Sequence, residues 1–161
     1  MTATQRATLK AILWGGLLAS SVDVFAASLI FQLNPVVILH AIASGLLGKP
    51  SFAGGMPTAV LGLGLQWFMG LLIAAVYVLA VQRLAWMHRY WRAAGVAYGV
   101  VIYFVMNYVV VPLSNAWPGR DFSKPIDWAK FGENMLAMIL FGLIIALFAR
   151  RFLPSPAATG D

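Results

Sequence analysis

Four long apolar runs constrain this chain more than any other feature. They cover residues 11–33, 58–81, 93–113 and 132–149. A helix needs about 20 predominantly apolar residues to cross a bilayer, and each run is close to that length. The whole chain is 61% hydrophobic and only 10% charged, whereas a soluble domain carries roughly 25% charged residues. The sequence therefore predicts an all-α integral membrane protein, a bundle of four transmembrane helices that forms a single domain over residues 1–161.

A shorter apolar segment lies between the first two runs. Asn34 is a typical N-cap residue, Pro35 is favoured at the first helical position, and Gly48 provides a stop signal. The expected helix, residues 35–47, is too short to span a bilayer. We therefore expect it to lie in the membrane interface or to enter the membrane as a re-entrant segment.

The basic residues lie almost entirely between the apolar runs and predict the orientation. Seven of the 11 Lys and Arg residues fall in the N-terminus, the second connection and the C-terminus, and four fall in the other two connections. Because cytoplasmic loops are enriched in Lys and Arg, both termini are expected in the cytoplasm. The absence of cysteine fits either side of a bacterial inner membrane, which is the predicted location. The last residues, about 154–161, have the composition of a short disordered tail.

The second connection combines basic and aromatic side chains. Its members are Arg83, Trp86, Arg89, Trp91 and Arg92. This composition is typical of a contact with anionic lipid head groups, and a surface that docks a partner protein is the alternative. The net charge of +6 does not indicate nucleic-acid binding, because the basic residues are loop charges. The expected partners are membrane lipids, with a homo-oligomer or a larger membrane complex as further possibilities.

Each apolar run also carries small and polar residues at a spacing of three or four. In lipid, helices associate through close packing and hydrogen bonds, so such residues mark the faces that meet. The four sets are Gly16, Ser20, Asp23 and Ala27; Gly62, Gln66, Gly70 and Ala74; Gly95, Gly99, Tyr103 and Asn107; and Asn134, Met138, Gly142 and Ala146. They predict a compact bundle in which backbones approach closely.

The polar residues of these runs form the candidate site. Asp23 lies near the middle of the first run, where a charged side chain costs about 2.5–3.5 kcal/mol. No Lys or Arg lies at a matching depth, so Asp23 is expected to be protonated and to donate a hydrogen bond. The other candidate members are Ser20, Gln66, Tyr103, Asn107, Glu133 and Asn134, with His40 on the short helix above them. Together they predict a polar intramembrane pocket that opens toward the outer side.

Such a pocket favours a protein that binds or passes a small solute, an ion or a proton, because an intramembrane carboxyl group can exchange protons or bind a cation. Two alternatives are open. In the first, Asp23 only locks the bundle through hydrogen bonds, and the chain is a non-catalytic accessory or assembly subunit. In the second, Asp23, His40 and Glu133 are acid–base groups of a membrane enzyme that acts on lipid.

Several well-defined site motifs are absent from the sequence. It contains no glycine-rich phosphate loop, no H-E-x-x-H zinc motif and no G-x-S-x-G nucleophile motif. The two histidines, His40 and His88, are expected on opposite sides of the membrane, which excludes bis-histidine haem ligation. The spacing of His40, Asp23 and Glu133 carries no metal signature. We therefore predict no metal, no cofactor and no catalytic residue.

The last third of the chain, "NYVVVPLSNAWPGRDFSKPIDWAKFGENMLAMILFGLIIALFARR", carries a family resemblance. A polar residue in the third run is followed by Pro112 and Leu113, then by an acidic-aromatic loop, and Glu133 opens the last run before a basic end. This arrangement resembles the end of small bacterial inner-membrane proteins of the YagU type. The resemblance implies an inner-membrane location and four spans, and it implies no activity.

Overall fold

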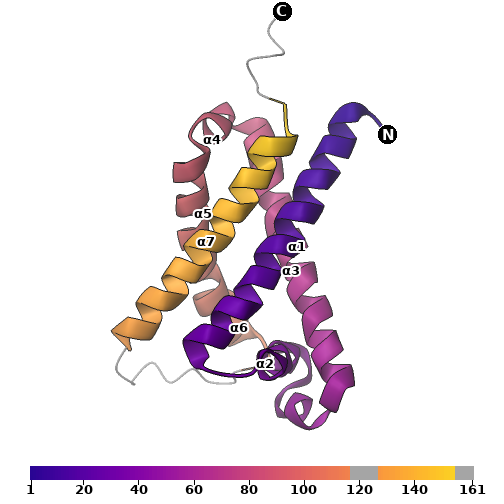
Figure 1. The fold of residues 1–161 in the computed structure, drawn as a ribbon, viewed down its shortest axis with the longest axis vertical. Helices are drawn as coiled ribbons and strands as arrows, with labels where there is room; N and C mark the ends of the chain where they lie inside the picture. The colour runs from indigo at the N-terminus through magenta and orange to yellow at the C-terminus, as the bar shows by residue number, and fades with distance from the viewer. Residues whose placement is uncertain (117–126, 155–161) are drawn as a thin grey trace, which may run out of the picture.

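The computed structural model describes residues 1–116 and 127–154, which are almost entirely helical and contain no strand. Four long apolar helices confirm the predicted all-α membrane bundle (Figure 1). The elements in chain order are α1 (Ala3–Phe31), α2 (Pro35–Leu47), the 3-10 helix η1 (Lys49–Ala53), α3 (Gly55–Arg83), α4 (Ala85–Arg89), α5 (Trp91–Val105), the π-helix η2 (Met106–Val110), α6 (Val111–Leu113) and α7 (Trp128–Phe152). All but the first residue of the predicted tail, 154–161, lies outside the described residues.

The first spanning helix is longer than the apolar run that predicted it. α1 begins at Ala3 because Thr2 and Gln5 cap it. The Gln5 N–H donates to Thr2 Oγ1 at 3.2 Å, and the Thr2 N–H donates to Gln5 Oε1 at 2.8 Å. This capping box satisfies two amide groups that the helix itself leaves open. At about 1.5 Å per residue the helix is about 43 Å long, so it extends beyond a hydrocarbon core of about 30 Å.

The short helix α2 has the predicted bounds because its end signals act as expected. Oδ1 of Asn34 accepts the Val36 N–H at 2.9 Å and so caps the first turn. Gly48 ends the helix with a φ of 70°, a backbone conformation that favours glycine. Asn34 and Gly48 therefore fix both ends of this element locally.

The spanning helices pack side by side in the order α5, α7, α1, α3 (Figure 1). The N-terminus of α1 and the C-terminus of α7 lie together at one end, which we call the basic end. α2 lies at the other end, which we call the α2 end, and packs against α3. α2 also contacts the segment after α6, where the Asn115 N–H donates to the Gly45 carbonyl oxygen at 2.9 Å. α2 thus bridges α3 and the end of the third span.

Glycines set the distance between paired helices. A Cβ atom on Gly16 of α1 would lie 2.9 Å from the carbonyl oxygen of Gly70 in α3, and one on Gly142 of α7 would lie 2.7 Å from the backbone nitrogen of Gly99 in α5. Both distances are shorter than real Cβ contacts. A Cβ on Gly62 would overlap a backbone carbonyl of α2. These contacts confirm the close backbone approach predicted from the small residues, and they pair α1 with α3 and α5 with α7.

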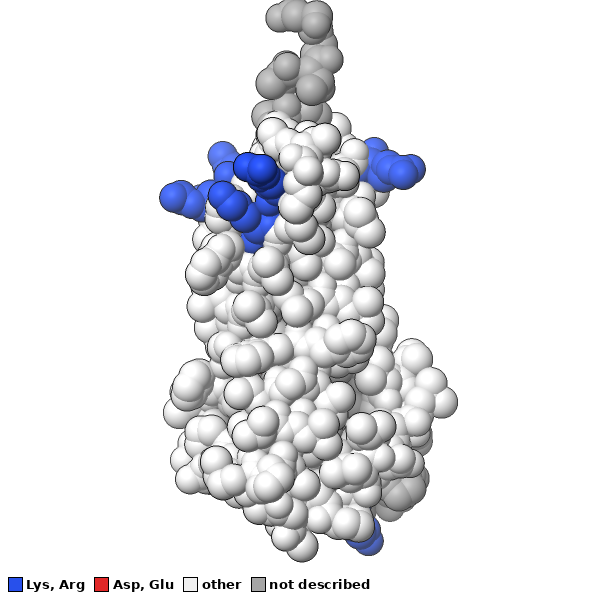
Figure 2. All heavy atoms as spheres, turned by 90° about the vertical axis from the view of Figure 1, so that its right-hand side faces the viewer, with Lys and Arg blue, Asp and Glu red and all other residues white. Residues whose placement is uncertain are grey.

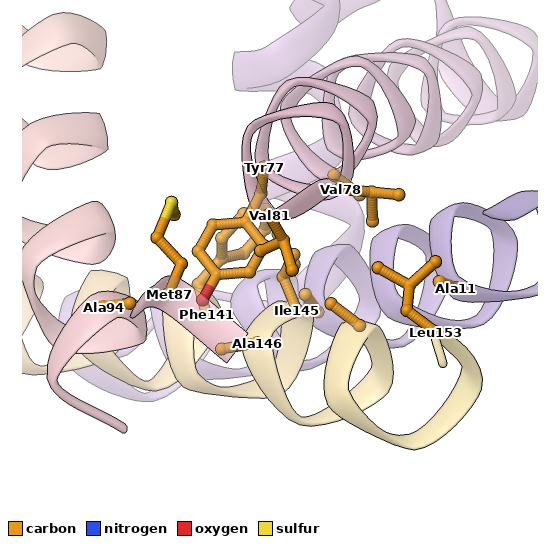
Figure 3. Close-up of a cluster of buried hydrophobic side chains, with 13 residues drawn as sticks. Ala11, Tyr77, Val78, Val81, Met87, Ala94, Phe141, Ile145, Ala146 and Leu153 are labelled. Atoms are coloured by element: carbon orange, nitrogen blue, oxygen red, sulfur yellow. The ribbon is translucent and has the colours of Figure 1, made fainter. Parts of the chain in front are cut away.

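The apolar core lies in the half of the bundle nearer the basic end. Tyr77 and Ile145 are among its largest fully buried side chains. Figure 3 shows Val78, Val81, Met87, Ala94, Phe141 and Ala146 around them, from α3, α4, α5 and α7. Because Met87 belongs to α4, the short helix between the second and third spans is part of this core.

The third span changes its winding as it nears the α2 end. α5 continues into the π-helix Met106–Val110, and the Val111 N–H bonds to the Met106 carbonyl oxygen five residues earlier. Pro112 follows directly. Proline has no N–H, and its ring clashes with the carbonyl four residues before it, so a regular α-helix cannot continue unchanged. The π-turn accommodates this proline, and such turns occur frequently at functional sites.

Candidate functional site

The strongest candidate site joins α1 and α3 through a polar pair. The Gln66 side chain donates from Nε2 to Asp23 Oδ2 at 2.8 Å. The same nitrogen lies 3.3 Å from the Ser20 carbonyl oxygen, one turn earlier on α1. Asp23 and Gln66 were both predicted as members of the site, and the structure brings them together with Ser20. In this contact the Asp23 oxygen accepts a hydrogen bond, so any proton that Asp23 carries is on its other oxygen.

Close packing beside the pair explains why these two side chains meet. Gly16 and Gly70 hold α1 and α3 at backbone contact. Ser20 is fully buried against Gly70, and a Cβ on Gly70 would overlap the Ser20 hydroxyl. Within the described part of the chain, that hydroxyl has no hydrogen-bond partner. Ser20 therefore acts first as a small packing residue, and its carbonyl rather than its hydroxyl contacts Gln66.

The position of Asp23 on its helix shows which way the pair faces. Gly15 faces α7, because a Cβ there would lie 3.3 Å from the Cβ of Phe148, and Gly16 faces α3. At about 100° per residue, Asp23 lies between these two faces, close to that of Gly16. The Asp23 side chain is therefore on the inner side of α1, between α3 and α7. Asp23 and Gln66 are each only partly buried.

Glu133 lines a separate groove at the α2 end. This groove has a volume of about 550 Å³ and lies between the end of α1 and the start of α7. Its lining residues are Leu29, Ile30, Gln32, Asp127, Ala129, Lys130 and Glu133. Lys130 forms an ion pair with Asp127 at 4.0 Å. Glu133 is the second carboxylate that lines the groove. Asn134, next to Glu133, donates to the Lys130 carbonyl oxygen of its own helix at 2.8 Å.

His40 contributes to the turn between α2 and α3. Its Nε2 lies 2.9 Å from the Gly55 carbonyl oxygen, at the start of α3, and its ring packs edge-on against Phe52. The Ser51 hydroxyl donates to the His40 backbone carbonyl at 3.0 Å. In these contacts His40 holds the turn in place, at the same end of the molecule as the predicted pocket.

Tyr103 and Asn107 lie on the third span. The Tyr103 ring packs against Phe131 of α7 with ring centroids 5.3 Å apart. Asn107 lies in the π-turn and donates from Nδ2 to the Tyr103 carbonyl oxygen at 2.9 Å. Tyr98, which faces α3, precedes Asn107 by nine residues, or about two and a half helical turns. Asn107 therefore lies on roughly the opposite side of the third span from Tyr98.

The predicted lipid-contact residues gather at the basic end. Arg83, Arg89 and Arg92 are exposed, as is Trp86, while Trp91 is partly buried. Figure 2 shows the blue Lys and Arg side chains concentrated at this end of the molecule, with a long uncharged surface below them. The Arg89 guanidinium lies 5.5 Å from the centroid of the Tyr90 ring.

Two contacts were missed by the sequence reasoning. The Tyr98 hydroxyl donates to the Ile73 carbonyl oxygen at 2.7 Å, and its ring lies 4.9 Å from that of Tyr77, so this pair joins α5 to α3. The Trp67 indole N–H donates to the Ser21 hydroxyl at 3.3 Å. Tyr77 precedes Arg83 by six residues, and Tyr98 follows Arg92 by six. The two tyrosines are therefore equally deep in the membrane, and this was a signal available in the sequence.

In residues 1–116 and 127–154 no three His, Asp or Glu side chains come together as a possible metal site. Comparison with protein families, curated proteins and solved structures found no match to this chain, so the resemblance to the YagU type stays a prediction.

Proposed function

We propose that this chain is a small inner-membrane protein in which Asp23 and Gln66 form a polar site for a proton, a cation or a small polar solute. The single observation that carries the proposal is the 2.8 Å hydrogen bond between Gln66 and Asp23. Ionisable residues inside membranes are rare, and they mark ion, proton or substrate sites. The pair is only partly buried and lies on the inner side of α1, which supports access for a small ligand.

The predicted orientation places the entrance to this site on the outer side of the membrane. Seven basic residues belong to the basic end: Arg6, Lys10, Arg83, Arg89, Arg92, Arg150 and Arg151. By the positive-inside rule this end faces the cytoplasm, together with both termini. Asp23 is the 21st of the 29 residues of α1, counted from the basic end, so it lies in the half of the helix nearer the α2 end. A ligand would therefore arrive beside α2.

The accessory-subunit interpretation is favoured by one specific observation. The polar pair lies within two turns of the Gly16–Gly70 contact on both helices, and Gln66 also touches the Ser20 carbonyl. A hydrogen bond placed beside such a contact holds two helices in register. On this view Asp23 stabilises the bundle and binds nothing. The lipid-enzyme interpretation gains no such support, since His40, Asp23 and Glu133 have separate surroundings.

Infrared difference spectroscopy of the protein in nanodiscs separates these interpretations. Spectra recorded on either side of neutral pH report carboxyl groups that exchange protons with water. We expect a carboxyl band that responds to pH and disappears in Asp23→Asn, whereas Asp127→Asn, which alters a carboxylate outside the spans, leaves that band in place.

If no band responds to pH in the wild type, and Asp23→Asn is as well folded but less stable, the accessory interpretation holds. A variant at the partner residue, Gln66→Leu, adds a second criterion. In a ligand site, loss of the Gln66 hydrogen bond shifts the pH response of Asp23. If Asp23 is only a structural donor or acceptor, Gln66→Leu changes stability without revealing a pH response.

A further inference from the structure

Two arginines from different helices lie against one tryptophan at the basic end. Trp91 is the first residue of α5. The Arg92 guanidinium carbon lies 5.3 Å from the centroid of the Trp91 ring, and that of Arg150, in the last turn of α7, lies 5.4 Å from it. Cations are attracted to the face of an indole ring at such distances. We call Trp91, Arg92 and Arg150 the arginine clamp.

No described carboxylate neutralises the arginine clamp. The carboxylates in the described ranges are Asp23, in the half of α1 away from the basic end, and Asp127 and Glu133, at the start of α7. The one ion pair found there, between Lys130 and Asp127, is also at the α2 end. Two positive charges held near one ring repel each other, so an anion bound beside them is stabilised. Guanidinium groups bind phosphate oxygens in pairs, which makes a phosphate the best-fitting anion.

The surface next to the arginine clamp indicates where the rest of the ligand lies. Val96 follows Arg92 by four residues on α5, and Leu147 precedes Arg150 by three on α7, so each lies on the same helix face as its arginine. The Val96 side chain is 38% exposed and that of Leu147 is 47% exposed. Both are directed toward the membrane interior from the clamp. A phospholipid fits this surface, because its phosphate can bind the two arginines while its acyl chains lie along the exposed apolar side chains of Val96 and Leu147.

We propose that the arginine clamp binds the phosphate of an anionic phospholipid, whose acyl chains follow Val96 and Leu147, and that this lipid joins α5 to α7. The proposal does not rest on the Asp23–Gln66 site. It also goes beyond a general head-group contact of the second connection, because it requires Arg150 of α7, a residue that the sequence analysis did not assign.

Native mass spectrometry on the full chain tests this proposal. The purified protein is exposed to equal amounts of phosphatidylglycerol and phosphatidylcholine in detergent, and the lipids that stay bound are counted. The wild type is expected to retain phosphatidylglycerol at least about tenfold better than phosphatidylcholine, and R92Q/R150Q is expected to lose most of that preference.

The matched control is R6Q/R151Q, which removes two exposed positive charges from the same end of the molecule but neither from the arginine clamp nor from the second connection. Arg6 lies near the start of α1, as Arg92 lies at the start of α5, and Arg151 lies in the last turn of α7, as Arg150 does. The control therefore also matches the effect of the helix dipole. We expect the control to keep phosphatidylglycerol binding within about twofold of the wild type. Equal losses in the two double variants would overturn the proposal, because the attraction would then come from net charge alone.

Two further measurements test whether binding needs the paired donors of arginine and the acyl chains of the lipid. Arg150→Lys keeps the charge and removes the paired donors, so an intermediate loss of binding is expected. Inorganic phosphate, which has no acyl chain, is added as a competitor to the wild type. If it displaces the lipid at concentrations similar to those of the lipid itself, the clamp binds free phosphate and the proposal fails. A wild type without preference for phosphatidylglycerol also refutes it.

Discussion

Adding one methyl group at Gly142 should separate α5 from α7. A Cβ atom at this position would overlap the Gly95 carbonyl oxygen and would lie 2.7 Å from the backbone nitrogen of Gly99. Ordinary van der Waals contact begins at 3.4 Å, so the second distance is too short by about 0.7 Å. Both opposing atoms belong to the backbone of α5. No side chain can rotate away, and the helices themselves must move apart.

The size of the effect follows from this rigidity. Overpacking in a well-packed interior typically costs about 1–3 kcal/mol, and backbone opposition places Gly142→Ala in the upper half of that range, at about 2–3 kcal/mol. Replacing glycine by alanine in a helix also contributes a favourable term of about 0.5–1 kcal/mol. The variant Gly132→Ala measures that favourable term alone, because Gly132 lies on the same helix and a Cβ there meets nothing within 4 Å.

The assay is reversible unfolding of the protein in mixed micelles, with helix content followed as the denaturing detergent increases. Gly132→Ala is expected to be as stable as the wild type or slightly more stable. Gly142→Ala should lower the free energy of unfolding by about 2–3 kcal/mol relative to Gly132→Ala. If the two variants have the same stability within about 0.5 kcal/mol, the close contact of α5 and α7 at Gly142 is not present in the membrane protein.

Three smaller predictions concern the other contacts. Gly62→Ala should loosen α2, because its Cβ overlaps a carbonyl of that helix, and hydrogen exchange in α2 should therefore rise. Gly64→Ala is the control: its Cβ meets nothing within 4 Å, so hydrogen exchange in α2 should stay unchanged. Tyr98→Phe keeps the ring but removes the 2.7 Å hydrogen bond to Ile73, so about 1 kcal/mol of unfolding free energy should be lost in the micelle assay. Asn34→Ala removes the α2 cap at a cost of about 1 kcal/mol, and exchange should increase in its first turn but not in its last.

The elements of the fold could be predicted because each has a local cause. Long apolar runs predict spanning helices through their length alone. The short helix α2 was predicted with its bounds because Asn34 and Gly48 act within a few residues of its ends. The extension of α1 to Ala3 was missed, since its cause is a capping box of polar residues outside the apolar run. Hydropathy detects the part of a helix that lies in lipid, and capping decides where that helix begins.

The pairing of the faces could not be predicted in the same way. The small residues on each span showed that close contacts exist, but many pairings of four similar faces satisfy that pattern. The structure pairs Gly16 with Gly70 and Gly99 with Gly142. Asp23 and Gln66 were expected together because their depths match. Depth alone also suggested Asn107, but depth does not give direction around a helix, and Asn107 lies on roughly the opposite side of the third span from Tyr98.

The position of α2 links the fold to the proposed site. Gly62 and Gln66 are four residues apart, so they lie one turn from each other on the same face of α3. Since the α2 backbone lies against Gly62, α2 covers the turn of α3 that adjoins the polar pair on the side of the α2 end. α2 is also fixed at both of its own ends, by the Asn34 cap and by the bond from Asn115 to Gly45. If Asp23 and Gln66 form the ligand site proposed above, a ligand that reaches Asp23 from this side passes beside α2, and the contacts that fix α2 are then part of its path.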